Sequence, residues 1–131
     1  MSAMNRPWFA IAWFAIWGLF QAYAVGSVFA GTWQRPEAFP EEAYVSLIYP
    51  DVFFIPLYLL TAGLLLRRHW LGLVIGLVAG GGVLYALIYL LALSGLRGIA
   101  NVTADGMFLI CTVLAIWQLS ERLRVKLKTT G

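Results

Sequence analysis

Four long apolar stretches separated by short connections constrain this chain more than any other feature. They cover about residues 8–30, 47–66, 70–93 and 99–119. A helix of roughly 20 apolar residues crosses the hydrocarbon layer of a bilayer, which is about 30 Å thick. We therefore expect a single transmembrane domain over residues 1–131 without a soluble module. The predicted fold class is an all-α membrane protein, a four-transmembrane-helix bundle.

The composition excludes other classes of protein. Of the 131 residues, 62% are hydrophobic and 11% are charged, whereas soluble domains average about 45–50% apolar and about 25% charged residues. A disordered chain would lack this hydrophobicity, and the single cysteine, Cys111, cannot form an internal disulfide. The class of protein left by these exclusions is an integral membrane protein, which is in contact with the lipid bilayer.

The basic residues are distributed unevenly between the two sides of the predicted bundle. Seven of the nine fall on one side, and only Arg35 and Arg97 fall on the other. The seven are Arg6, Arg67, Arg68, Arg122, Arg124, Lys126 and Lys128. Because basic flanking residues are retained in the cytoplasm, we expect a multi-pass protein of the inner (cytoplasmic) membrane with both termini in the cytoplasm. Five of the six acidic residues lie on the opposite side, which agrees with this topology.

The first stretch also has the features of a secretory signal. Arg6, an apolar run and the small residues Ala22 and Ala24 imitate a cleavage site. The apolar run continues beyond this site to Ala30, so it is long enough to span the membrane. We interpret it as a retained first helix.

Two connections and several aromatic residues complete the predicted topology. A short interfacial helix is expected over residues 41–47, where the outer loop 31–46 meets the second span. The basic tail, residues 120–131, is expected to extend the last helix and to contact anionic lipid headgroups. Aromatic residues prefer the membrane boundaries, which predicts Trp8, Trp70 and Trp117 at the inner boundary and Trp33 and Tyr44 at the outer one.

Three glycines of the third stretch are predicted to pack helices together. Gly72, Gly76 and Gly80 are spaced four residues apart, and this spacing produces a smooth groove that a second helix can approach closely. Both internal packing of the bundle and contact with a homo-oligomer partner or a larger membrane complex fit the pattern.

Polar residues recur at helical spacing on each predicted span. Because polar groups in a membrane are costly, they normally face the interior of the bundle. Counting about 1.5 Å per residue from the outer ends of the spans places the main ones in the outer half of the membrane. We predict an outward-facing cavity, whose candidate ligand-binding residues are Asp105, Asp51, Gln21, Tyr58, Tyr85, Tyr89 and Asn101.

The two aspartates carry the predicted chemistry. A carboxylate within the membrane needs a partner, and two neighbouring carboxylates can bind a cation, hold an amine or relay a proton. Each has an alternative explanation: Asp51 follows Pro50 where it could cap a helix, and Asp105 could hydrogen-bond to Tyr85, Tyr89 or Asn101. The sequence does not decide between these roles.

No other chemistry is indicated by the sequence. His69 is the only histidine, and Cys/His clusters with metal-ligand spacing, nucleotide-binding loops and nucleophile elbows are absent. We therefore predict no catalytic residues, no metal and no cofactor, and a membrane enzyme is only the third alternative for this chain. Nucleic acid is not an expected partner, because the positive charge follows from membrane retention.

Several segments carry a family resemblance. They are residues 49–58 (YPDVFFIPLY), the Leu66-Arg67-Arg68 turn with Trp70 and Gly72, and Ala104-Asp105. Together with the spans, they resemble uncharacterised small four-span bacterial integral membrane proteins over roughly two thirds of the chain, a resemblance that implies no activity. The chain is similar to small multidrug resistance transporters in outline only, because Ala12, Trp13 and Phe14 stand where those proteins have a glutamate.

These observations predict a small membrane protein that binds or passes a small cationic or polar ligand, a cation or a proton. The ligand, cation or proton is predicted to bind in the outward-facing polar cavity or to pass through it. The alternative is a structural or accessory subunit that packs against a larger membrane complex through its glycine face. An Asp105→Asn change would distinguish the two, because only the first function requires that carboxylate.

Overall fold

A computed structural model describes residues 6–33, 40–46, 48–93 and 99–130, and the regular secondary structure in these parts is all α-helical. The helices are α1 (Trp8–Phe29), α2 (Glu41–Ser46), α3 (Ile48–Leu66), α4 (Leu71–Ala92) and α5 (Ile99–Thr130). Four of them, α1, α3, α4 and α5, are long and apolar enough to cross a membrane. The predicted all-helical fold with four spans is therefore confirmed. Arg35, Leu47 and Arg97 lie outside the described residues.

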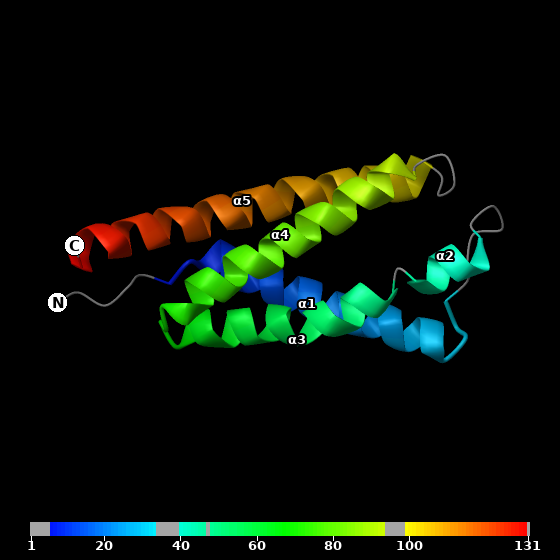
Figure 1. Cartoon of the computed structure of the whole chain (residues 1–131), viewed down its shortest axis with the longest axis horizontal. Helices are drawn as coiled ribbons and strands as arrows, with labels where there is room; N and C mark the ends of the chain where they lie inside the picture. The colour runs from blue at the N-terminus through cyan, green and yellow to red at the C-terminus, as the bar shows by residue number, and fades with distance from the viewer. Residues whose placement is uncertain (1–5, 34–39, 47, 94–98, 131) are drawn as a thin grey trace.

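The four spanning helices form a closed bundle. Helices α1 and α4 each pack against both α3 and α5. Helix α4 runs obliquely: it begins beside α3 and ends beside α5 (Figure 1). Both termini and the α3–α4 turn lie at one end, here called the terminal end, and α2 lies at the opposite end, the loop end (Figure 1). Arg6, Arg67 and Arg68 therefore share the terminal end with the basic last turns of α5.

The start of α1 is completed by side chains from distant segments. Its N-cap residue is Pro7, which has no side-chain hydrogen bond to offer the first turn. The Gln118 Oε1 atom accepts a hydrogen bond of 2.9 Å from the Ala10 backbone N–H. Nearby, Arg6 Nε donates a 2.9 Å hydrogen bond to the Leu66 carbonyl oxygen at the end of α3. These contacts satisfy backbone groups that helix ends leave unpaired.

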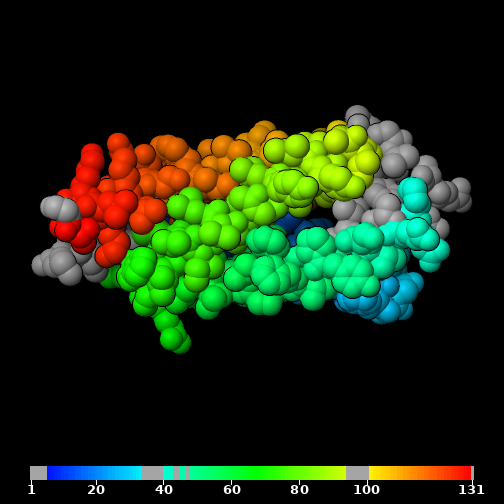
Figure 2. All heavy atoms as spheres, in the orientation of Figure 1, coloured from blue at the N-terminus to red at the C-terminus, as the bar shows by residue number. Residues whose placement is uncertain are grey.

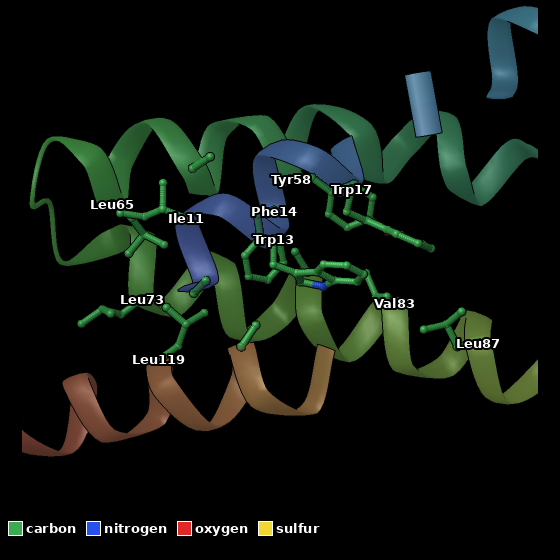
Figure 3. Close-up of a cluster of buried hydrophobic side chains, with 14 residues drawn as sticks. Ile11, Trp13, Phe14, Trp17, Tyr58, Leu65, Leu73, Val83, Leu87 and Leu119 are labelled. Carbon is green, nitrogen blue, oxygen red and sulfur yellow. The ribbon is translucent and has the colours of Figure 1, made fainter. Parts of the chain in front are cut away.

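The half of the bundle near the terminal end is closely packed. Phe14, Leu65, Leu73 and Leu119 are fully buried and converge from the four spanning helices (Figure 3). The Phe14 ring also lies against α4, where a Cβ atom would be 3.8 Å from it at Gly76 and 3.6 Å from it at Gly80. This dense layer separates the terminal end from the loop end.

Helix α5 is longer than its apolar stretch. The predicted span ends at residue 119, but the helix continues to Thr130, so that it extends over about 48 Å at 1.5 Å per residue. The exposed Glu121 and Arg124 form an ion pair of 2.6 Å on this extension. The charged tail is thus continuous with the membrane helix.

A buried hydrogen bond joins α1 to α5. Trp13 Nε1 donates to Thr112 Oγ1 over 3.1 Å, and the same hydroxyl donates to the Phe108 carbonyl oxygen over 2.7 Å. Both side chains are buried. Together with the Gln118–Ala10 hydrogen bond, this bond fixes the register of α1 against α5.

Replacing Trp13 with phenylalanine is expected to lower the free energy of unfolding by about 0.6–2 kcal/mol, because the interhelical hydrogen bond is lost while the aromatic volume is largely kept. The measurement is unfolding in mild detergent, followed by circular dichroism. Trp117→Phe is the matched control, since Trp117 is 64% exposed. Equal stability of the two variants would contradict the assigned role of the bond.

Candidate ligand-binding site

A cavity of about 970 Å³ occupies the loop-end half of the bundle. All four spanning helices contribute to its wall, and each does so with the residues nearest the loop end. In the space-filling view, the surface is hollowed between α3 and α4, and atoms of α1 are visible through the opening (Figure 2). The lining residues are Trp17, Phe20, Gln21, Ala24, Val25, Val28, Trp33, Ser46, Ile48, Pro50, Asp51, Phe54, Tyr58, Gly82, Tyr85, Ala86, Tyr89, Leu90, Asn101, Ala104, Asp105 and Phe108.

The structure brings all seven candidate ligand-binding residues to this one cavity. They arise from four helices that are distant in sequence, and none faces a separate site. Helical spacing explains their convergence, because residues three, four and seven apart share one helix face. Their role in binding stays a prediction, since no ligand is present.

Asp51 lies in the first turn of α3 and on the wall of the cavity. Its position near a helix N-terminus is favourable for a negative charge. Within the described ranges, the Asp51 carboxylate makes no hydrogen bond or ion pair. The carboxylate is half-buried and therefore remains available to a cationic group that enters the cavity.

Asp105 is the more deeply buried of the two acids, with 5% of its surface exposed. It lies on α5, one turn beyond Asn101, and both residues line the cavity. Asp105 and Asn101 each already interact with another group. Asp51 is therefore the more accessible of the two acids, whereas the sequence analysis selected Asp105 for the substitution that distinguishes the two functions.

Aromatic side chains form the floor of the cavity. The Trp17 ring lies 5.3 Å from Phe108 in an edge-to-face arrangement, measured between ring centroids, and 5.5 Å from Trp13 in a stacked one. Phe20 lies 6.1 Å from Trp17. Trp17 is buried, and within the described residues its Nε1 atom has no hydrogen bond of good geometry.

Tyr58 connects the floor to the upper wall. Its ring stacks with Phe54 at 6.0 Å and with Phe14 at 6.3 Å, so it links the cavity to the packed core. The Tyr58 side chain is also close enough to Trp17 and to Asp51 to interact with both. The cavity therefore combines an aromatic base with an acidic upper wall.

The sequence analysis named the tyrosines of the site but not its tryptophan and phenylalanine members. Trp17 and Phe20 precede Gln21 by four residues and one residue, and Phe54 and Phe108 each follow a cavity aspartate by three. This spacing places most of them on the polar face of their helix. The signal was present, but phenylalanine in an apolar span does not distinguish a cavity wall from a lipid-facing surface.

Tyr85 and Tyr89 occupy the rim of the cavity rather than its centre. Tyr85 is 76% exposed and Tyr89 is 44% exposed, although both line the cavity. The α4 wall therefore opens to the outside of the bundle. The oblique course of α4 explains this exposed position at the rim.

The three spaced glycines lie inside the bundle. A Cβ atom at Gly76 would lie 2.6 Å from Leu119 Cδ1 and 2.9 Å from Thr61 Cγ2, and one at Gly80 would lie 2.7 Å from Ile116 Cγ1. At Gly72 the nearest atoms belong to Leu65. The groove thus holds α4 against its own neighbours, and a partner protein would have to use another face.

No protein-family model, curated protein or solved structure matches this chain. The described residues also contain no group of three or more histidine, cysteine, aspartate or glutamate side chains that could hold a metal ion. Function must therefore be argued from the cavity.

Proposed function

We propose that this protein binds a small organic cation in the loop-end cavity. The observation that carries the proposal is the Asp51 carboxylate, which lines a large cavity without a hydrogen bond or ion pair among the described residues. A carboxylate in partly desolvated surroundings is stabilised by an opposite charge that enters with the ligand. Asp105 supplies a second acidic group on the opposite side of the bundle.

The size and chemistry of the wall favour an organic ligand over a bare ion. Sites for small organic molecules typically enclose about 300–1,000 Å³ and have mainly apolar walls with a few polar groups. The aromatic rings of Trp17, Phe54 and Phe108 can contact an alkyl or aryl body, and an indole or phenyl face attracts a nearby cation. A site for a proton or a bare metal ion would not require a cavity of this volume.

The dense core favours binding over passage. Phe14, Leu65, Leu73 and Leu119 are fully buried in the core and do not line the cavity. The basic residues at the terminal end favour a cytoplasmic location for that end under the retention rule. In this orientation the cavity opens toward the extracytoplasmic side and is closed below.

The test measures binding to the protein in phosphatidylcholine nanodiscs, with empty nanodiscs as the background. Radiolabelled dodecyltrimethylammonium is expected to bind saturably, because it combines a cation with an apolar body. Dodecyl sulfate, with the same chain and the opposite charge, is expected not to compete. Absence of saturable binding, or equal competition by dodecyl sulfate, would overturn the proposal.

A further inference from the structure

The cavity has an opening in the side of the bundle, between α3 and α4. The two helices are in close contact at Gly82, where a Cβ atom would lie 2.6 Å from Phe54 Cε1. Beyond this contact α4 moves away from α3 toward α5, and a hollow separates their surfaces (Figures 1 and 2). The opening therefore lies between the Gly82–Phe54 contact and the loop end.

The exposure of the α4 wall identifies where this opening leads. Tyr85 lines the cavity and is 76% exposed, so a side chain of the cavity wall is also part of the outer surface. Tyr85 lies seven residues before the end of α4, which corresponds to a depth of about 10 Å at 1.5 Å per residue. At that depth a spanning helix is surrounded by acyl chains.

The surfaces beside the opening are apolar. Phe53, which is 69% exposed, is in edge-to-face contact with Phe54 at 5.5 Å. Ile88, which is 59% exposed, lies three residues after Tyr85 and so close to it on the surface of α4. Large apolar side chains at this depth face lipid without cost.

The polarity of the cavity changes with depth as it does in a lipid leaflet. Counted from the helix ends, Asp51 lies about 4 Å and Asp105 about 9 Å below the loop end, whereas Trp17 lies about 18 Å below it. Acidic and amide groups are thus near the loop end, and the aromatic floor is deep. A molecule with a charged head and an apolar chain fits this gradient in the orientation that it has in a bilayer.

We infer that the ligand is a bilayer-dissolved cationic amphiphile that enters sideways between α3 and α4. This inference rests on the proposed function and names its ligand class and source. The cationic head lies beside Asp51, and the alkyl chain contacts Phe54, Phe108 and Trp17. Charge complementarity selects the positive head, and the lateral opening admits a chain without passage through water.

The experiment uses competitors that differ in how they can reach the cavity. Nanodiscs containing the full chain are loaded with radiolabelled dodecyltrimethylammonium. One competitor is dioleoyl-trimethylammonium-propane, a two-chain cationic lipid that stays in the bilayer. The second is dioleoylphosphatidylglycerol, an anionic lipid of similar size, and the third is tetramethylammonium, which stays in water.

The expected result is that the cationic lipid lowers bound probe at least about 10-fold, the anionic lipid has no effect, and tetramethylammonium competes only at far higher concentration. Ala86→Trp, which narrows the opening from the α4 wall, is expected to lower the saturable binding of the probe itself, because the probe enters by the same route as the cationic lipid. Val78→Trp is the matched control, since Val78 is exposed on the same helix and does not line the cavity.

Three outcomes would overturn the inference in different ways. Competition by tetramethylammonium but not by the cationic lipid would show entry from water, and the proposed function would survive. Absence of saturable probe binding would remove the proposed function itself, and the lateral route with it. Competition by both lipids alike would show that the site does not select charge, which also contradicts the inference.

Discussion

Replacing Gly76 with leucine is expected to destabilise the bundle by about 3 kcal/mol or more and to leave much of the protein aggregated in mild detergent. Even a single Cβ atom at this position would lie 2.6 Å from Leu119 Cδ1 and 2.9 Å from Thr61 Cγ2. Leu119 and Thr61 are fully buried, so neither can move into free space. The helices would have to separate to admit the larger side chain.

The matched control for this change is Gly81→Leu. A Cβ atom at Gly81 meets nothing within 4 Å, and Gly81 is exposed on the same helix. We expect its unfolding free energy to stay within about 0.5 kcal/mol of the parent. Gly76→Ala adds only one carbon and should lower the free energy of unfolding by about 1–3 kcal/mol. This variant allows the unfolding free energy to be measured if the leucine variant does not fold. Equal stability of the Gly76 and Gly81 variants would contradict the internal position of the glycine groove.

Replacing Asp51 with asparagine is expected to weaken binding of dodecyltrimethylammonium about 10- to 100-fold. The substitution keeps the size of the side chain and removes the charge that the cationic head would contact, an interaction worth about 1.5–3 kcal/mol. The dissociation constant in nanodiscs is the measured quantity. Stability should change little, because Asp51 makes no hydrogen bond or ion pair with the described residues.

Glu42→Gln provides the control for loss of one negative charge near the same end. Glu42 lies on α2, is exposed and does not line the cavity. If both variants bound the probe equally, a general surface charge rather than Asp51 would be responsible for any affinity. An Asp51→Asn variant that binds the probe with the affinity of the parent would contradict the proposal, because the proposal depends on the Asp51 carboxylate.

The helices could be predicted closely because the bilayer imposes a single length requirement on every span. The predicted boundaries of the first and third spans differ from α1 and α4 by one residue or less at each end. The sequence also predicts that the basic tail extends the last helix beyond residue 119, and α5 does continue on charged residues to Thr130. Hydropathy alone marks only the end of the membrane layer and not the end of the helix.

The cavity could be predicted in part, because helical spacing assigns polar residues to one face of each span. This reasoning grouped Asp51 with Tyr58 and Asn101 with Asp105. It could not predict that Tyr85 would lie at a lateral rim, since this depends on the oblique packing of α4. Packing angles arise from side-chain contacts between distant helices, such as Gly82 with Phe54, which periodicity within one helix does not encode.

The most direct test of the central claim measures the access of water to single cysteines. In a Cys111→Ala background, cysteine replaces Ala24 or Ala104 in the cavity wall, or Ala79 or Ala115 in the packed core. A charged, membrane-impermeant thiol reagent is added outside intact cells. We expect rapid labelling at Ala24→Cys and Ala104→Cys and none at the two core positions. Labelling of the core positions, or protection of the cavity positions, would contradict a water-accessible cavity that opens away from the cytoplasm.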